Sequence, residues 1–199
     1  MKNLKQLPIY LFAALTFGFA SCESDDPAPE NEGEVITDVN LNFQELDAGG
    51  NPVGLAFSAK ASDPEGIEVG ATPTIETVNL VKGKKYRMTI TVSNSIENED
   101  ITAEILAEAD EHQFFFLGTA FTGNILTIAY DDPSGDLIGL QNELTVSSSP
   151  GTNNTQLRVI LRHDLDKSYP GATNPNFQNY EQAGGETDLD ITFPVVINN

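Results

Sequence analysis

The sequence contains a single cysteine, Cys22, and no tryptophan. One thiol cannot form a disulfide within the chain or supply the several thiolates of a structural zinc site, so we expect burial of apolar side chains alone to hold the fold together. Basic residues are also scarce, with 10 lysines and arginines against 30 aspartates and glutamates and a formal net charge of −20. Because nucleic-acid binding depends on basic side chains that displace counterions from phosphates, this balance excludes nucleic acid as a partner.

Signatures of catalysis are missing as well. The chain has no Gly-x-Ser-x-Gly nucleophile turn, no His-Glu-x-x-His zinc helix and no glycine-rich phosphate loop. Its only histidines are His112 and His163. We expect His112 to satisfy backbone groups at the end of a helix and His163 to lie at the rim of the core. We therefore expect no enzyme, and an enzyme acting on envelope or extracellular polymers is the alternative.

The N-terminus carries the one long apolar stretch of the sequence. Lys2 and Lys5 precede an uncharged and mostly apolar run over residues 7–20. The run is shorter than the roughly 20 apolar residues that a membrane-spanning helix requires. A positive start, a short apolar run and small residues at its end are typical of a cleaved secretory signal. We interpret residues 1–21 as a signal peptide.

Cys22 follows this run directly, in the order Phe19-Ala20-Ser21-Cys22, which resembles a lipobox. In a lipobox, small residues admit the signal peptidase and the cysteine thiol carries a diacylglycerol thioether. We expect Cys22 to become the acylated N-terminus of the mature protein. Two or more acyl chains hold a protein stably on a membrane, whereas a single chain binds only marginally. The alternative is an ordinary signal peptide with a cysteine there by chance.

An acidic segment comes next and begins with Glu23, Ser24, Asp25 and Asp26. Carboxylates directly behind an acylated cysteine resemble the export signal of surface lipoproteins, which takes them to the outer leaflet of the outer membrane. We expect residues 22–34 to form a disordered acidic tether and the protein to be exposed at the cell surface, with a periplasm-facing domain as the alternative. Without the two lysines of the signal peptide, 8 basic and 30 acidic residues remain, a net charge of −22.

Residues 35–199 are expected to form one domain, a length that can bury a core without covalent links. Apolar and polar residues alternate with a period of two in segments bounded by clusters of Gly, Pro, Asn and Asp. The predicted strands are 35–43, 53–59, 74–81, 86–93, 113–117, 125–130, 140–147, 157–163 and 189–197. This pattern predicts an all-β fold, an antiparallel β-sandwich that is immunoglobulin-like in the loose sense, with one short helix.

Three local features refine this prediction. The spacing of apolar residues predicts the helix over residues 99–110, with Asn98 as its N-cap, crossing from one sheet to the other. Three consecutive phenylalanines at residues 114–116 predict a central strand that is buried on both faces. Pro194 lacks a backbone donor, so the last strand is expected at a sheet edge. Residues 82–84 are expected to form the turn that joins the strands 74–81 and 86–93, which would then pair with each other.

Two loops offer oxygen ligands for a hard cation. Asp131, Asp132 and Asp136 fall within six residues, and Asp164 with Asp166 opens a long loop. Calcium takes six to eight oxygens from carboxylates and carbonyls in such loops. The sequence therefore makes a Ca²⁺ site possible at the first of these loops, and solvated turn acids are the alternative.

The long loop also holds three aromatic residues, Tyr169, Phe177 and Tyr180. Carbohydrate-binding surfaces commonly use flat aromatic platforms, so these residues are candidates for a glycan-binding site. The alternative is that the three rings pack the loop against the rest of the domain.

Several segments resemble a family of small Bacteroidota-type surface lipoproteins of unknown function. They are residues 34–37 (EVIT), 109–115 (ADEHQFF), 161–163 (LRH) and 183–188 (AGGETD). The resemblance covers the mature domain and implies no catalytic residues. Members of such families are sometimes labelled with the type 1 periplasmic binding fold, which has two α/β lobes, whereas the period of this sequence predicts a β-sandwich.

These observations together predict a membrane-anchored, surface-exposed lipoprotein with a non-catalytic binding or envelope-structural role. Its partners would be the membrane, through the lipid anchor, and an envelope protein or a glycan.

Overall fold

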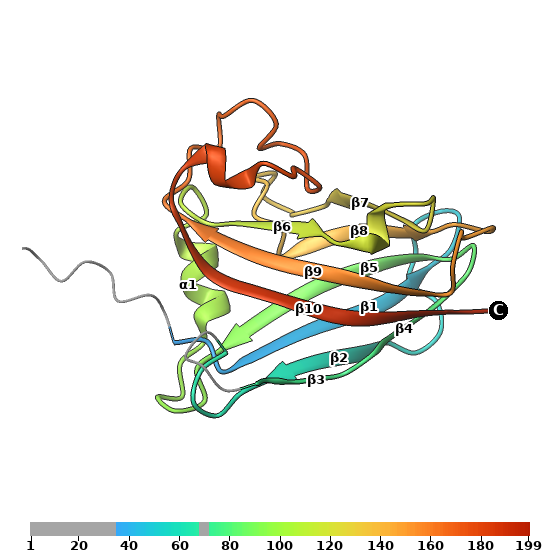
Figure 1. Ribbon diagram of the computed structural model, residues 1–199, viewed down its shortest axis with the longest axis horizontal. Helices are drawn as coiled ribbons and strands as arrows, with labels where there is room; N and C mark the ends of the chain where they lie inside the picture. The colour runs from blue at the N-terminus through green and yellow to red at the C-terminus, as the bar shows by residue number, and fades with distance from the viewer. Residues whose placement is uncertain (1–34, 68–71) are drawn as a thin grey trace, which may run out of the picture. The chain divides into compact units, whose positions relative to one another are not determined.

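The computed structural model describes residues 35–67 and 72–199, which form one compact unit of the chain. The signal peptide, Cys22, the export signal Glu23, Ser24, Asp25 and Asp26, and the tether up to residue 34 lie outside the described residues. In the described part, two β-sheets pack face to face around a common apolar core (Figure 1). The prediction of an all-β sandwich with one short α-helix is confirmed.

The larger sheet has six strands and is antiparallel throughout. In spatial order they are β3 (Thr74–Ile75), β2 (Phe57–Ser62), β1 (Asp38–Leu46), β5 (Lys85–Ser93), β8 (Gln141–Val146) and β7 (Leu126–Tyr130). The smaller sheet has four strands, in the order β4 (Val78–Val81), β10 (Glu186–Asn198), β9 (Asn154–His163) and β6 (Gln113–Leu117). One pair, β10 with β4, is parallel, so the smaller sheet is mixed rather than antiparallel.

The alternation of apolar residues places one face of each strand in the core. In β10 the alternate residues Leu189, Ile191, Phe193, Val195 and Ile197 are all buried, as the sequence pattern predicted. Burial of each such side chain contributes about 1.5–3 kcal/mol. Because a shift of one residue would turn all of them to solvent, the pattern also fixes the register.

The segment 74–81, predicted as one strand, is divided between the two sheets. Its first part, β3, pairs with β2 in the six-stranded sheet, and its second part, β4, pairs with β10 in the four-stranded sheet. The predicted pairing across residues 82–84 is therefore wrong, because β4 and β5 belong to different sheets. Strands that change sheets in this way make the corner of a sandwich.

The helix α1 (Ile101–Ala107) connects β5 of one sheet to β6 of the other, as predicted. Ile101 and Ile105 are fully buried, and the hydroxyl of Thr102 accepts from Val92 N at 2.7 Å and donates to Val92 O at 3.0 Å. The N-cap is Asp100, not Asn98 as predicted. Asn98 has a φ of +59° inside the preceding turn, a left-handed conformation that asparagine tolerates better than most residues.

β6 is buried on both faces, as its three phenylalanines predicted, but it lies at the edge of its sheet and not at the centre. Phe114 and Phe116 face the main core, and Phe115 faces the opposite side. The segment 164–185 covers that opposite side, and loop carbonyls accept from the edge amides: Ile138 O from Phe114 N and Pro175 O from Phe116 N. The covering segment is remote in sequence, which is why a local pattern misplaced the strand.

The edge prediction for β10 is also wrong, because this strand lies between β9 and β4. Pro194 pairs with Gln156 of β9, and β4 pairs with β10 only from Val195 onward. Pro194 thus lies just before the first residue of β10 that pairs with β4. Its missing N–H group therefore interrupts no hydrogen bonds between β10 and β4.

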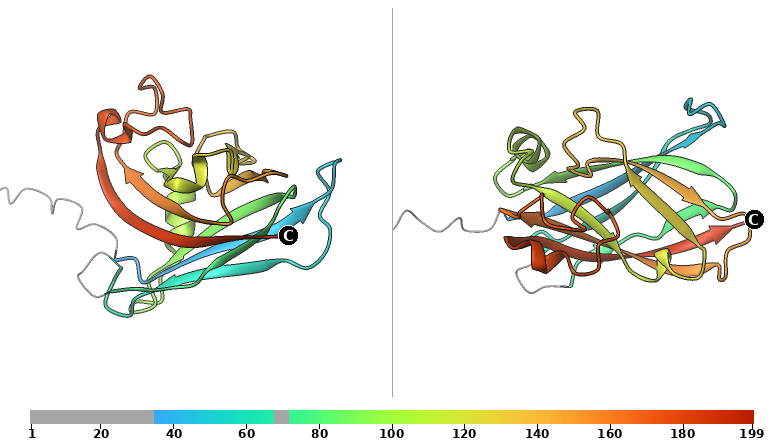
Figure 2. Two further views of the ribbon diagram at one scale, coloured as in Figure 1. Left: turned by 45° about the vertical axis from the view of Figure 1, so that its right-hand side comes forward. Right: turned by 90° about the horizontal axis from the view of Figure 1, so that it is seen from above.

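The long segment 164–185 folds back over the four-stranded sheet at the end of the sandwich that also carries α1 (Figures 1 and 2). It contains the short 3-10 helix η2 (Tyr180–Ala183), and a second one, η1 (Thr119–Phe121), follows β6. A small second core forms beneath the segment from Phe115, Leu117, Ile160, Leu165, Tyr180 and Ala183.

Among the residues that the structure describes, no helix has the length and apolar character needed to cross a membrane.

Candidate functional site

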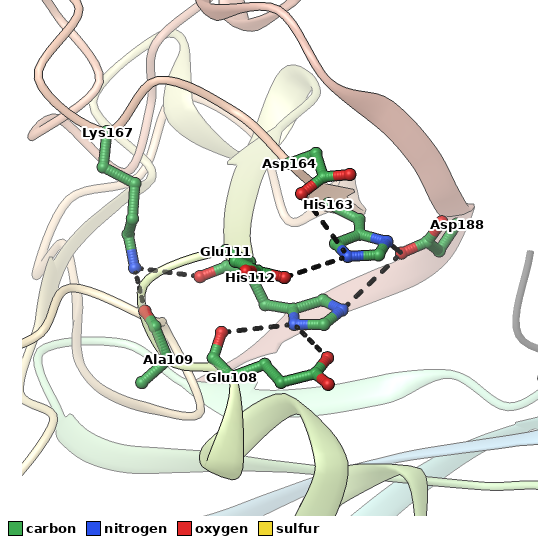
Figure 3. Close-up of polar contacts among 8 residues, drawn as sticks. All are labelled: Glu108, Ala109, Glu111, His112, His163, Asp164, Lys167 and Asp188. Atoms are coloured by element: carbon green, nitrogen blue, oxygen red, sulfur yellow. Dashed lines mark hydrogen bonds and ion pairs between the residues drawn. The ribbon is translucent and has the colours of Figure 1, made fainter. Parts of the chain in front are cut away.

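The two histidines of the chain meet at the α1 end of the sandwich. β6 and β9 pair with Gln113 opposite Arg162, and His112 precedes the first of these residues while His163 follows the second. The antiparallel register therefore places the two rings side by side. They are stacked, with centroids 4.4 Å apart and planes inclined by 8° (Figure 3).

Asp188 reaches the same place through an irregularity in β10. The register of β10 against β9 shifts between Thr187 and Leu189, which makes Asp188 the extra residue of a β-bulge. A bulge re-aims a side chain that would otherwise follow the alternation of the strand. Asp188 Oδ2 lies 4.0 Å from Nε2 of His112 and 4.0 Å from Nδ1 of His163. We call His112, His163 and Asp188 the histidine cluster.

The cluster contains buried polar atoms without hydrogen-bond partners among the described residues. His112 is 0% exposed and its Nε2 has no such partner, and the Asp188 side chain is 5% exposed with no such partner for Oδ2. Burial raises the pKa of Asp188, and the nearby histidines His163 and His112 act in the opposite direction. A buried group left without a partner costs about 1–3 kcal/mol, more if charged, so the arrangement opposes folding and invites a functional explanation.

Three exposed carboxylates surround the other edge of the stacked rings. Glu108 Oε2 lies 3.8 Å from His112 Nδ1, while Glu111 Oε2 and Asp164 Oδ1 lie 3.6 and 3.8 Å from His163 Nε2 (Figure 3). We call these three residues the acidic rim. Each ring thus has the buried Asp188 at one nitrogen and the rim at the other. The rim gives this end of the domain a high local density of negative charge.

Lys167 ties the long segment to the connection between α1 and β6. Its Nζ donates to Ala109 O at 2.6 Å and to His112 O at 2.9 Å. Carbonyls at the end of a helix lack partners within the helix, and a lysine is a favourable partner for them. Burial lowers the pKa of Lys167. The clamp fixes the backbone that positions His112 and the two glutamates of the acidic rim.

The bulge that carries Asp188 is held by a second clamp. The Arg162 guanidinium donates to Gly184 O at 2.5 Å, to Gly185 O at 2.6 Å and to the hydroxyl of Thr187. Gly185 has a φ of +71°, and a Cβ on it would lie 2.0 Å from His163 O. Only glycine fits this close approach, which brings the start of β10 against the end of β9.

The chemistry open to this arrangement is proton transfer or metal binding. A histidine that faces a buried carboxylate has the relation of a general base to the acid that orients it. None of the eight residues drawn in Figure 3 carries a hydroxyl or a thiol, so this set offers no nucleophile of the serine or cysteine type. Two imidazoles and several carboxylates are, however, a ligand set used for divalent transition metals.

The acids predicted to bind calcium are engaged in the loop that joins β7 to β8. Asp132 accepts backbone N–H bonds at both oxygens, from Gly139 at 2.7 Å and from Gln141 at 2.9 Å. Asp131 Oδ2 accepts from the Gln141 side chain at 3.0 Å, and Asp136 is exposed. Within the described residues, these three acids are not among the groups whose ligand atoms lie within 4.8 Å of one another. The geometry gives Asp131 and Asp132 a part in shaping the loop.

The aromatic residues proposed for glycan binding belong to the second core. Tyr180 is 6% exposed and stacks on Phe115 with centroids 5.9 Å apart, and Phe177 lies between Phe115 and Tyr169 at 6.4 and 6.0 Å. The rings therefore pack the long segment onto the sheet, and Tyr180 presents no open face to a ligand.

Sequence reasoning considered the two histidines separately and did not include Asp188. The missing step was the register of β6 against β9, which no local pattern shows. The three residues come from the separate segments 109–115, 161–163 and 183–188, which lie far apart in the sequence.

Comparison of the chain with protein-family models, with curated proteins and with solved structures gives no significant match.

Proposed function

We propose that this chain is a lipoprotein of the outer membrane, anchored by acyl chains on Cys22, and that its β-sandwich is displayed at the cell surface in a non-catalytic binding or envelope-structural role. The observation that carries the proposal is the order Phe19-Ala20-Ser21-Cys22 at the end of a short apolar run. The cysteine is the only one in the chain, and it stands where lipidation requires it.

The acidic residues behind the cysteine support surface display. Glu23, Asp25 and Asp26 follow it directly, and the segment up to residue 34 has no basic residue. A segment of this composition has too few apolar groups to fold by itself, so it suits a tether between a membrane and a folded domain. A periplasm-facing orientation is the alternative.

The non-catalytic role is supported by the composition of the histidine cluster. Two histidines and one carboxylate can hold or move a proton, but none of the residues drawn beside them in Figure 3 carries the hydroxyl or thiol of a serine- or cysteine-type nucleophile. The enzyme alternative has one observation in its favour, the buried Asp188 that faces both rings at 4.0 Å. A general base of this kind would act on a water molecule rather than through a covalent intermediate.

The anchor is tested by Cys22→Ser in the full chain. The substituted protein cannot be acylated, so it should leave washed membranes and should not incorporate a labelled fatty acid, whereas the unaltered protein does both. Retention of Cys22→Ser on membranes through detergent-free high-salt and carbonate washes would show a different anchor and contradict the proposal.

Surface display is tested on intact cells with added protease. The unaltered domain should be digested, and the triple substitution of Glu23, Asp25 and Asp26 by alanine should protect it by leaving it inside the outer membrane. The matched control replaces the three later glutamates, Glu30, Glu32 and Glu34, by alanine and should remain accessible. Protection of the unaltered protein, with a known surface protein digested, would place the domain in the periplasm.

A further inference from the structure

We propose that the histidine cluster and its acidic rim form a binding site for one divalent transition-metal ion, with Zn²⁺ as the probe. His112, His163 and Glu108 are the ligands, and Asp188 is the residue that orients both imidazoles. The site is independent of how the chain is anchored, so it can be tested without reference to the proposed location.

The ligand atoms already lie close together. One ligand atom from each of Glu108, His112 and His163 lies within 4.8 Å of the other two, and the same holds for Glu111, His163 and Asp164. Zn²⁺ binds nitrogen and oxygen at about 2.0–2.2 Å, so two ligands of one ion lie at most about 4 Å apart. The separations in the first group are at most 4.8 Å, so a contraction of no more than about 1 Å brings them into this range. His163 belongs to both groups, so a rim carboxylate of the second can complete the coordination.

The buried side of the cluster distinguishes it from a chance gathering of surface acids. A metal-bound histidine almost always donates its second ring N–H to a carboxylate or carbonyl, which fixes the tautomer. Here Nε2 of His112 and Nδ1 of His163 both face the buried Asp188. With those nitrogens protonated, the lone pairs of His112 Nδ1 and His163 Nε2 face the acidic rim. A metal bound at the rim would thus hold both rings in the tautomer that directs an N–H group towards Asp188 Oδ2.

The hydrogen-bond contact that competes for His112 Nδ1 is weak. His112 Nδ1 lies 3.4 Å from the carbonyl oxygen of Glu108, which is long for a hydrogen bond. The rim carboxylates stand 3.6–3.8 Å from the rings, at ion-pair range rather than in short hydrogen bonds. A metal ion therefore displaces little at His112 Nδ1 when it enters.

The parallel rings set the movement that binding requires. An imidazole binds a metal in its own plane, and two rings inclined by only 8° cannot both point at one ion. One ring must tilt. His163 lies at the end of β9 with its side chain 12% exposed, whereas His112 is fully enclosed, so His163 is the ring that moves.

The donor set selects the class of metal. Imidazole nitrogens favour Zn²⁺, Ni²⁺ and Cu²⁺, whereas Ca²⁺ and Mg²⁺ require oxygen ligands. The net charge of the domain raises the local concentration of any cation, but it does not discriminate between the two classes. If the histidines are ligands, the site must therefore bind Zn²⁺ in preference to Ca²⁺.

The test measures Zn²⁺ binding to the full chain in detergent by competition with a chromophoric chelator. We expect one ion per chain, unaffected by a tenfold excess of Ca²⁺. Glu108→Gln should weaken binding at least about tenfold, and Asp188→Asn by about 10- to 100-fold, the range for residues that orient ligands. The matched control is Asp110→Asn, an exposed acid of the same turn outside both groups, which should change affinity less than about twofold.

Ligation by imidazole is tested with Co²⁺ in place of Zn²⁺. The unaltered chain should give the intense visible bands of four-coordinate Co²⁺, whose position changes in His163→Asn, whereas exposed carboxylates alone would leave only the weak absorption of six-coordinate Co²⁺. Absence of saturable Zn²⁺ binding would overturn the proposal, as would equal losses in Glu108→Gln and Asp110→Asn. If His163→Asn does not fold, the exposed Glu108, whose side chain is 53% accessible, decides the question.

Discussion

Two polar regions of the domain differ in how their charged groups are satisfied. In the β7–β8 connection, both carboxylate oxygens of Asp132 accept backbone N–H bonds shorter than 3 Å. In the histidine cluster, Asp188 Oδ2 accepts none from the described residues, although Asp188 is the more deeply buried of the two acids. The first acid stabilises the loop that holds it. The second is kept at a cost to folding.

This difference shows why a count of acids in the sequence is a poor guide to a binding site. Asp131, Asp132 and Asp136 fall within six residues of one loop, yet the loop itself uses two of them. The histidine cluster takes its three residues from the position before β6, from the end of β9 and from β10. No local sequence pattern therefore reveals it. The candidate site is marked by buried polar atoms without hydrogen-bond partners and not by a large number of acidic residues.

Replacing aspartate by asparagine in each of the two regions is expected to change the free energy of unfolding by different amounts, and the larger change is expected at Asp132. Asp132→Asn keeps the shape of the side chain but replaces one acceptor oxygen by an NH₂ group, which then faces a backbone N–H. Hydrogen bonds to a charged group contribute about 1.5–3 kcal/mol, so we expect the free energy of unfolding to fall by about 2–3 kcal/mol. Chemical denaturation followed by circular dichroism measures this, with m-values checked for constancy.

The matched control for that substitution is Asp136→Asn in the same loop. Asp136 is exposed, and substitutions at such positions stay within about 0.5 kcal/mol. If Asp132→Asn were no more destabilising than Asp136→Asn, the hydrogen bonds from Gly139 and Gln141 would not be holding the loop, and Asp132 would not differ from an exposed acid in its contribution to stability.

Asp188→Asn is expected to have a smaller effect on stability, within about 1 kcal/mol in either direction, when measured at pH 8 in the presence of a chelator. A neutral amide is less costly to bury than a carboxylate, and this offsets the loss of the two 4.0 Å contacts. A loss above about 2 kcal/mol would mean that Asp188 is a stabilising residue of the fold, and its role as an orienting residue for a metal would lose its main support.

The fold could be predicted from the sequence where the pattern is local. Alternation predicted β5, β8 and β10 to within a few residues, because the period of two is a property of each strand alone. The position of β6 could not be predicted, since what buries Phe115 is the segment 164–185. For the same reason, the division of 74–81 between two sheets is decided by β2 and β10 and not by the segment itself.

The site was less accessible to sequence reasoning than the fold. His112 was expected at the end of a helix, and its Nδ1 does lie 3.4 Å from the Glu108 carbonyl. Its second neighbour, Asp188, arrives through a β-bulge, which depends on the close approach of Gly185 to His163. A bulge adds one residue to one strand of a pair, so it can be recognised only once the pair is known.

The smallest expected effect concerns calcium at Asp131, Asp132 and Asp136. A site there would stabilise the folded state by RT ln(1 + [Ca²⁺]/Kd), about 1.4 kcal/mol at ten times Kd. Asp132 already accepts hydrogen bonds from two backbone amides. We therefore expect CaCl₂ to raise the melting temperature no more than NaCl of equal ionic strength, which screens the net negative charge of the protein in the same way. The shift in melting temperature in CaCl₂ is compared with the shift in NaCl, first for the unaltered chain and then for the double variant Asp132→Asn with Asp136→Asn. Because each comparison is made within one protein, the lower stability of the double variant does not affect it. An excess of Ca²⁺ over Na⁺ that disappears in the double variant would show that the loop reorganises to bind the ion, and that acids satisfied by the backbone can still form a site.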